Sequence, residues 1–234
     1  MSLPPVLLIS GLSGKAAFWD RQVAAVAPRF LPITYDLKAR NTVEALASDA
    51  LELLDARGIE RCHIVGHSTG GAIAQVIAEE HPQRVARLVL SATWCAPTPP
   101  FKALFELRKR ILMELGAEAY SAHGALLAWP DDWLDAHPEL LRSRIDEREK
   151  EAVLARLDAI LAFDRAAQLA SIGAPTLVVC AQDDNLVPAG HSRRIAAGIR
   201  GSILTLLPRG GHFPQATATT AYNSALLEFL ENAK

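Results

Sequence analysis

The stretch Cys62–Gln75, CHIVGHSTGGAIAQ, decides the fold of this chain. A short, largely apolar run leads into Gly-His-Ser-Thr-Gly-Gly at residues 66–71, and a helix-forming sequence follows to about Glu80. A strand, a Gly-x-Ser-x-Gly turn and a helix in this order are typical of a nucleophilic serine held at a sharp bend. Such a bend strains the serine backbone and requires neighbours without side chains, because strand and helix nearly touch there. We therefore predict Ser68 as a nucleophile; the alternative is a Gly/Ser-rich turn without chemistry.

The composition is that of an ordinary globular protein. The chain has 234 residues, of which 50% are apolar and 21% charged, enough for one full core and a small subdomain. Its 24 basic and 26 acidic residues give no overall field that would attract nucleic acid or an anionic membrane. No apolar run approaches the ~20 residues of a membrane span, and no signal peptide is recognisable. Three cysteines, two of them in apolar runs, indicate free thiols in a reducing compartment.

From these properties we expect a soluble cytoplasmic protein, monomeric or homodimeric, whose partner is a small-molecule substrate. We expect neither a nucleic-acid nor a membrane partner, and the motifs imply no metal, nucleotide or organic cofactor.

Strand and helix patterns alternate along most of the chain. The predicted strands are Val6–Ser10, Phe30–Asp36, the run into Ser68, Arg87–Ala92, Thr176–Gln182 and Ile203–Leu207. The predicted helices cover about 17–27, 43–57, 72–80, 191–199 and 220–231. Strands alternating with helices imply right-handed crossovers. The fold class is therefore α/β, with a mostly parallel twisted sheet and helices on both faces.

Two helix predictions are more specific. Asn41 with Glu44 three residues later forms a capping-box pattern. The helix that follows carries an apolar stripe, which Gly58 ends. The stripe consists of Val43, Leu46, Ala47, Ala50 and Leu54.

Residues 96–164 have a different character. Three prolines between 97 and 100 interrupt the alternation, and helical patterns follow without strands. One is marked by Leu104, Leu107, Ile111 and Leu115, and another by Val153, Leu157, Ile160 and Leu161. We predict a core of residues 1–95 and 165–234 with a helical cap at 96–164, inserted after the strand that follows the Ser68 helix. The charge run Asp146–Glu151 is interpreted as a solvated helix face.

A serine hydroxyl needs a base, and the base needs an orienting carboxylate. In open parallel sheets such groups collect at the carboxyl ends of the strands. Asp183 and Asp184 follow the strand 176–182, and His212 follows the strand 203–207. We predict Ser68, Asp184 and His212 as a catalytic triad, with Asp183 as a turn residue.

The other histidines have simpler interpretations. His63 and His67 would lie roughly 13 Å apart on a strand, too far to share a metal ion. We expect His67 to pack beside Ser68, and His81, His123, His137 and His191 to be structural.

This set of motifs resembles the α/β-hydrolase superfamily. The matching segments are Ser10-Gly11-Leu12, Gly66–Gly70, Asp184 with Val187-Pro188, and Gly211-His212, with Ala170–Pro188 especially typical. Within the superfamily the chain is most similar to RutD-type aminoacrylate hydrolases of pyrimidine breakdown. The similarity lies in ISGLSGKAAFW at residues 9–19, LAWPDDWLD at 127–135 and LARLDAILAFD at 154–164.

The resemblance implies roles for individual residues. Ser68 would be the nucleophile, His212 the base and Asp184 the orienting carboxylate, with the backbone amides of Leu12 and Thr69 as the oxyanion hole. Members of the family usually carry an N-terminal β-hairpin and a longer Arg-Gly-x-Gly-x-Ser loop. This chain starts directly with the first parallel strand and has only Leu37–Arg40 before the next helix.

The expected reaction is hydrolysis of a small ester, lactone, amide, enamine or carbamate, with aminoacrylate as one candidate. A 3-oxoadipate enol-lactonase, another esterase, a carbon–carbon bond hydrolase or a perhydrolase could use the same triad. A catalytically silent ligand-binding protein is the alternative of another class. The candidate pocket walls are Trp94, Phe101, Phe105, Trp129, Trp133 and Phe213. Lys102, Arg108, Lys109 and Arg110 could attract a carboxylate substrate, but we expect them on a solvated helix face.

Overall fold

The computed structural model describes residues 3–142 and 149–232. Within them a six-stranded sheet has the order β2-β1-β3-β4-β5-β6, and every neighbouring pair is parallel. The strands are β1 (Pro5–Ile9), β2 (Leu31–Ile33), β3 (Cys62–His67), β4 (Val85–Ser91), β5 (Thr176–Ala181) and β6 (Ile203–Leu207). The α/β prediction is confirmed. The second strand is shorter than predicted, because only three residues pair with β1 at this edge of the sheet.

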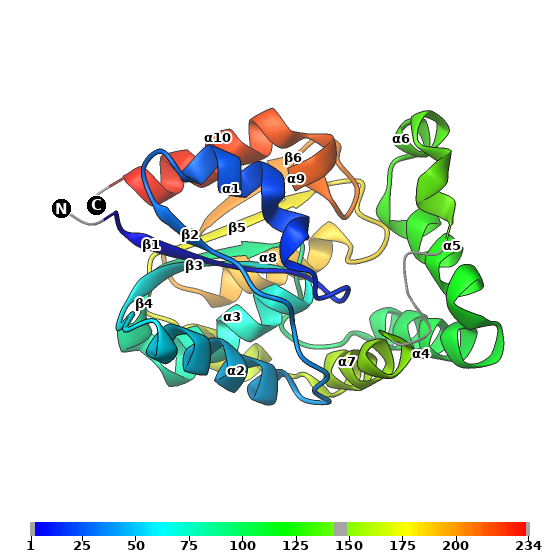
Figure 1. Cartoon of the computed structure of the whole chain (residues 1–234), viewed down its shortest axis with the longest axis horizontal. Helices are drawn as coiled ribbons and strands as arrows, with labels where there is room; N and C mark the ends of the chain where they lie inside the picture. The colour runs from blue at the N-terminus through cyan, green and yellow to red at the C-terminus, as the bar shows by residue number, and fades with distance from the viewer. Residues whose placement is uncertain (1–2, 143–148, 233–234) are drawn as a thin grey trace.

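Helices cover both faces of the sheet (Figure 1). The side chains of β1 alternate between the faces: Leu7 and Ile9 belong to one core cluster and Val6 and Leu8 to the other. Helices α2 (Val43–Ala56), α3 (Thr69–Glu80) and α8 (Ala189–Gly198) pack on the first face. Helices α1 (Asp20–Val26), after the short 3₁₀ turn η1 (Ala16–Trp19), and α10 (Thr219–Glu231) pack on the second. Continuous apolar strands are therefore buried on both sides.

The cap of α2 differs from the prediction by one residue. Thr42, in an extended conformation, accepts a hydrogen bond from the Ala45 amide at 3.2 Å. Asn41 does not cap the helix, because the chain enters the helical region only at Val43. Glu44 instead binds Arg165 at 2.7 Å. The predicted apolar stripe of α2 is buried throughout.

Residues 96–164, called the cap from here on, contain helices and no strand among the described residues. They comprise α4 (Pro99–Glu114), α5 (Gly116–Ala128), α6 (Asp131–Ala136), η3 (Pro138–Leu141) and α7 (Lys150–Ala162). Helices α4, α5 and α6 lie beyond one end of the sheet (Figure 1). The first half of the predicted charge run, residues 146–148, lies outside the described residues; Glu149 binds Lys15.

The buried face of α4 includes only half of the predicted stripe: Leu104 and Ile111 pack partly buried against the core. Leu107 and Leu115 are 46% and 70% exposed, whereas the helix buries Phe101, Phe105, Arg108 and Leu112. Phe101 and Phe105 lie 5.1 and 6.4 Å from Trp94, measured between ring centroids. Burial of these large aromatic rings sets the rotation of the helix, and Leu107 and Leu115 turn outward.

Arg165, directly after the cap, and Arg156, within it, hold the cap in place on the core. The Arg165 amide donates to the Cys95 carbonyl at 2.7 Å, which brings the two ends of the cap together. The Arg165 guanidinium also binds Glu79 at 3.0 Å and Glu80 at 2.9 Å. From α7, Arg156 donates to the Leu37 carbonyl at 3.1 Å and so holds the short connection that precedes α2.

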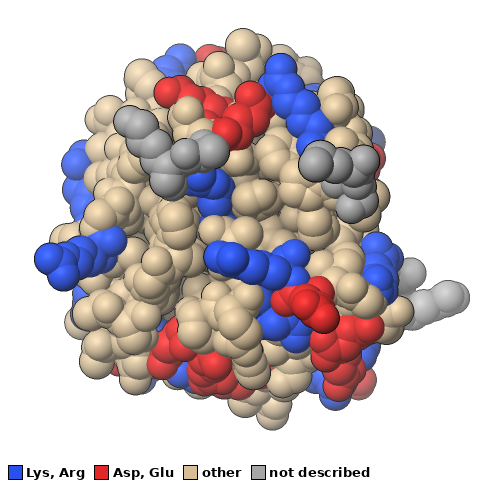
Figure 2. All heavy atoms as spheres, turned by 90° about the vertical axis from the view of Figure 1, so that its left-hand side faces the viewer, with Lys and Arg blue, Asp and Glu red and all other residues tan. Residues whose placement is uncertain are grey.

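At the end of the molecule opposite α5 and α6, acidic and basic side chains are intermixed (Figure 2). All three cysteines are free and buried. Among the described residues no helix is both long and apolar enough to cross a membrane.

Candidate active site

Ser68 occupies the sharp turn between β3 and α3. Its backbone is strained, with φ 53° and ψ −117°. A Cβ on Gly66 would lie 2.2 Å from the Gly70 carbonyl oxygen, and a Cβ on Gly70 would lie 2.1 Å from the Ile9 carbonyl oxygen. Only glycine fits at both positions, so the turn pattern has the steric basis that the sequence predicted.

The neighbouring strand β4 anchors this turn. The Ser68 amide donates to the Ser91 carbonyl at 2.8 Å, and the Thr93 hydroxyl donates to the Ser68 carbonyl at 2.7 Å. Thr93 was missed by the sequence reasoning. Its position directly beyond β4, at the carboxyl edge of the sheet, was the signal that could have found it.

His212 and Asp184 meet at the same edge from two other strands. His212 Nδ1 lies 2.8 Å from Asp184 Oδ2, and both side chains are buried. The other oxygen, Oδ1, accepts from the amides of Leu186 at 2.9 Å and Val187 at 2.8 Å. These amides fix the carboxylate orientation, and His212 therefore points its Nε2 away from Asp184.

In the described part of the chain, Asp183 does not contact His212 through a hydrogen bond between their side chains; it holds the loop that carries His212. Its Oδ1 accepts a hydrogen bond from the Gly211 amide at 2.9 Å and so connects the loop after β5 to the loop that carries His212. Gly211 has φ 59°, and a Cβ there would lie 2.4 Å from the Ala128 carbonyl oxygen. The His212 amide donates to that same carbonyl at 2.7 Å. The histidine loop is thus held by both core and cap.

His67 is a packing residue, as expected. Its ring is fully buried, stacks on Phe18 at 4.9 Å and lies 4.7 Å from the His212 ring. Burial, and then the neighbouring His212, hold the pKa of His67 well below its usual range. The neutral imidazole supports the wall beside Ser68 without adding charge. His63 packs against Phe30 instead, 5.6 Å between ring centroids.

Ser68 and His212 line one cavity of about 620 Å³. Within the described ranges no hydrogen bond joins the side chains of Ser68 and His212, but both residues border the same cavity. Gly11 and Leu12 line it too, and a Cβ on Gly11 would lie 3.2 Å from the Ser68 Cβ. The loop after β1 therefore lies against Ser68. The Thr69 amide opens α3, where the first amides of a helix lack partners within it.

Three of the six aromatic residues that we predicted as pocket walls line this cavity. Phe105, Trp129 and Phe213 do so, whereas Trp94, Phe101 and Trp133 are absent from its lining. Trp94 is buried beneath Phe101 and Phe105, and Trp133 stacks on His137. Both tryptophan rings therefore pack against other side chains of the protein instead of lining the cavity.

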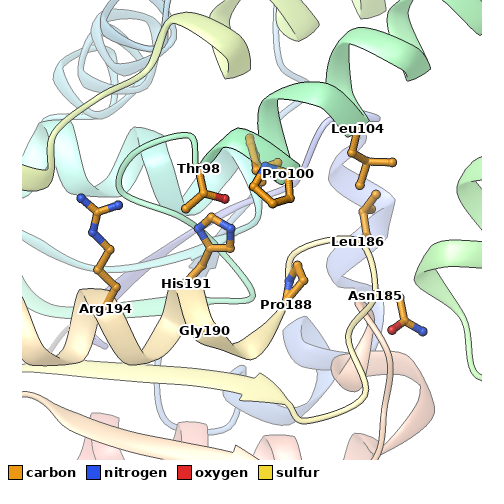
Figure 3. A pocket seen from close by; sticks show the side chains of 10 residues that line it. Thr98, Pro100, Leu104, Asn185, Leu186, Pro188, Gly190, His191 and Arg194 are labelled. Carbon is orange, nitrogen blue, oxygen red and sulfur yellow. The ribbon is translucent and has the colours of Figure 1, made fainter.

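Phe101 lines a second pocket, of about 510 Å³, between α4 and α8. There Thr98 lies across from His191, Pro100 from Pro188 and Leu104 from Leu186 (Figure 3).

Arg108 also departs from expectation. It is 4% exposed rather than solvated, and it lines the cavity that contains Ser68. Arg110 of the same helix does face solvent and pairs with Glu114 at 3.3 Å.

Comparisons with known proteins place this fold in one family. Residues 6–225 match the model of the alpha/beta hydrolase family. The protein named "Putative carbamate hydrolase RutD" of Caulobacter sp. strain K31 is 35% identical, over 96% of this chain and 90% of the relative. The protein of the same name from Variovorax paradoxus is 36% identical, over 96% of this chain and 91% of the relative.

Solved structures show the same fold. A hydrolase from Pseudomonas aeruginosa superposes with a TM-score of 0.88 at 29% identity, over 98% of this chain and 91% of that one. The enol-lactonase from Burkholderia xenovorans LB400 superposes with a TM-score of 0.91 at 24% identity, over 99% and 93%.

Proposed function

Because this chain belongs to the alpha/beta hydrolase family, we propose that it hydrolyses a small carbonyl compound through Ser68, His212 and Asp184. One observation carries the proposal. His212, which is joined to the buried Asp184 by a hydrogen bond of 2.8 Å, lines the same cavity as Ser68. A serine at a strained turn, a histidine and a buried carboxylate are the groups that acyl transfer needs.

In the proposed reaction His212 Nε2 removes the Ser68 hydroxyl proton as the serine oxygen bonds to the substrate carbonyl carbon. The carbonyl π electrons move to its oxygen, and the amides of Leu12 and Thr69 bind the oxyanion. When the oxyanion collapses, the leaving group departs with the proton from His212. Water, deprotonated by His212, then attacks the acyl-enzyme, and Ser68 recovers its proton. One oxyanion donor typically contributes about 3–4 kcal/mol to the transition state.

The candidate substrates are esters, lactones, amides, enamines and carbamates of small size. The similarity to proteins named "Putative carbamate hydrolase RutD", over 96% of the chain, supports a carbamate substrate. Aminoacrylate is the candidate that the motif resemblance implies. A cavity of about 620 Å³ is suited to a small molecule. The likeness to the enol-lactonase is 24% in identity and extends to the fold alone.

A labelling experiment tests the nucleophile. We expect a fluorophosphonate to attach stoichiometrically to Ser68 in the folded protein, and Ser68→Ala to abolish labelling. The substitution should also lower the hydrolysis of short p-nitrophenyl esters about a thousandfold or more. Ser121→Ala removes another hydroxyl from the same cavity and is the matched control. Unchanged turnover in Ser68→Ala would refute the assignment, and absence of labelling in folded wild-type protein would favour a silent ligand-binding protein.

A further inference from the structure

Arg108 is a buried cation in the roof of the cavity. It lies on the inner face of α4, one turn after Phe105, and both residues line the cavity that contains Ser68. Its neighbours on the helix behave differently: Lys109 binds Asp158 of α7, and Arg110 binds Glu114 of its own helix. Helix α4 therefore turns one basic residue inward and neutralises the next two.

The surrounding residues are shaped around the guanidinium group. The Arg108 Cζ lies 4.4 Å from the centroid of the Tyr120 ring on α5, a cation–π distance. One turn further along α5, a Cβ on Gly124 would lie 2.9 Å from Arg108 Nη1 and 3.0 Å from Nη2. Helix α5 thus provides an aromatic face and a glycine gap where the guanidinium sits.

Among the residues that the structure describes, this guanidinium has no acceptor. Arg108 Nε and Nη1 are both buried without a hydrogen-bond partner, and residues 3–142 and 149–232 provide no carboxylate within ion-pair distance. The Tyr120 hydroxyl is also buried without a partner. The buried Arg156 of α7, in contrast, donates to main-chain carbonyls. A desolvated charge without a counterion is costly, so an arginine in this state is explained best by an anion that arrives with the ligand.

The charge of the lining agrees with this explanation. Besides Arg108, the described lining contains Lys15, Arg21 and Arg142 against one acidic residue, Asp20, and Lys15 is paired with Glu149. The rest of the lining is polar or apolar and carries no fixed charge. Such a cavity favours an anionic substrate.

We propose that Arg108 binds a carboxylate of the substrate and so orients the reacting carbonyl toward Ser68. The inference rests on the proposed function, and it narrows the substrate class to small carboxylic acids with a second, hydrolysable carbonyl group. A carboxylate matches the planar donor fork of one guanidinium, and the Tyr120 hydroxyl offers an additional donor. Arg108 is thus a specificity-determining residue.

The test compares two esters of similar size: mono-p-nitrophenyl succinate, which carries a free carboxylate, and p-nitrophenyl butyrate, which is neutral. We expect wild type to favour the succinate ester in kcat/KM. Arg108→Gln should lower the ratio of the two kcat/KM values about a hundredfold, because only the charged ester loses a buried ion pair. The control Arg110→Gln removes the same charge from the solvent side of α4 and should leave the ratio unchanged.

A second measurement separates binding from a structural role. In ligand-free protein, Arg108→Gln should leave the melting temperature unchanged or raise it, because it removes an unpaired buried charge. Butyrate should raise the melting temperature of Ser68→Ala protein more than butyramide does, and the difference should vanish when Arg108→Gln is added. If Arg108→Gln fails to fold, or melts well below wild type, Arg108 is structural and the inference is overturned.

The outcomes distinguish the two proposals. Hydrolysis of both esters with a ratio that Arg108→Gln does not change would overturn the role of Arg108 and leave the hydrolase assignment intact. If wild type hydrolyses neither ester, the hydrolase assignment loses its support. The melting comparison of butyrate and butyramide then decides alone whether Arg108 binds a carboxylate.

Discussion

Replacing Asp184 by asparagine should disable the base while leaving the fold in place. Asp184 Oδ1 accepts from two backbone amides, those of Leu186 and Val187, at 2.9 and 2.8 Å. In an asparagine side chain at this position only the oxygen can accept these bonds, so the NH₂ group must take the place of Oδ2. There it donates to His212 Nδ1, which forces the proton of the neutral ring onto Nε2. A protonated Nε2 cannot accept the proton of Ser68.

The size of the effect follows from this forced tautomer. The same substitution in a serine protease triad lowers kcat by about 10⁴. Since each tenfold change is about 1.4 kcal/mol, we expect Asp184→Asn to raise the barrier by about 4–5.5 kcal/mol, a loss of 10³ to 10⁴ in kcat. Both backbone hydrogen bonds survive, so the free energy of unfolding should fall by no more than about 1–2 kcal/mol.

The assay is steady-state hydrolysis of a p-nitrophenyl ester together with urea unfolding. The matched control is Asp183→Asn, because this neighbour only accepts from the Gly211 amide, a bond that an asparagine oxygen can also accept. We expect Asp183→Asn to lose less than about fivefold in kcat. An Asp184→Asn variant that retains more than a tenth of wild-type kcat, or an Asp183→Asn variant that is worse, would refute the reasoning.

Two further predictions concern stability. Gly70→Ala should destabilise the protein by more than about 3 kcal/mol or prevent folding, because its Cβ would lie 2.1 Å from the Ile9 carbonyl oxygen. Gly173→Ala, whose Cβ meets nothing within 4 Å, should stay within about 1 kcal/mol of wild type; equal melting temperatures for both variants would contradict the steric argument. Burial, with smaller contributions from Arg87 and Arg61, lowers the pKa of His63 to about 4, below the value of about 6.5 in the unfolded chain. The unfolded state therefore takes up the proton first as pH falls, and this contribution to stability, complete above about pH 6.5, is lost toward pH 4. Because His63 is only partly buried, we expect His63→Gln to reduce the loss of unfolding free energy between pH 7 and 4.5 by about 1–2 kcal/mol, measured with urea; an identical pH dependence would contradict the shift.

Local sequence patterns were sufficient for the sheet and for the positions of the candidate triad residues. Ser68, Asp184 and His212 each follow a strand closely, and parallel strands bring their carboxyl ends to one edge. The glycines around Ser68 report a steric demand between residues close in sequence. Such signals require no knowledge of how distant helices pack.

Local sequence patterns did not determine which face of α4 is buried. Within α4 an apolar stripe through Leu107 and another through Phe105 are both plausible, and only contact with Trp94 selects the second. The same rotation turns Arg108 inward, whereas its sequence neighbours suggested a solvated face. The N-cap of α2 is Thr42 rather than Asn41, because the helix begins only at Val43 and both residue types can cap a helix.

The sequence by itself therefore determined the parallel sheet, the serine turn and the strand ends at which the triad candidates sit, because these depend on backbone sterics over a few residues. Only the tertiary structure decided which helix faces line the cavity and which charge lies within it. Helix rotation is settled by contacts between segments far apart in the chain, and a pattern along one segment does not contain them.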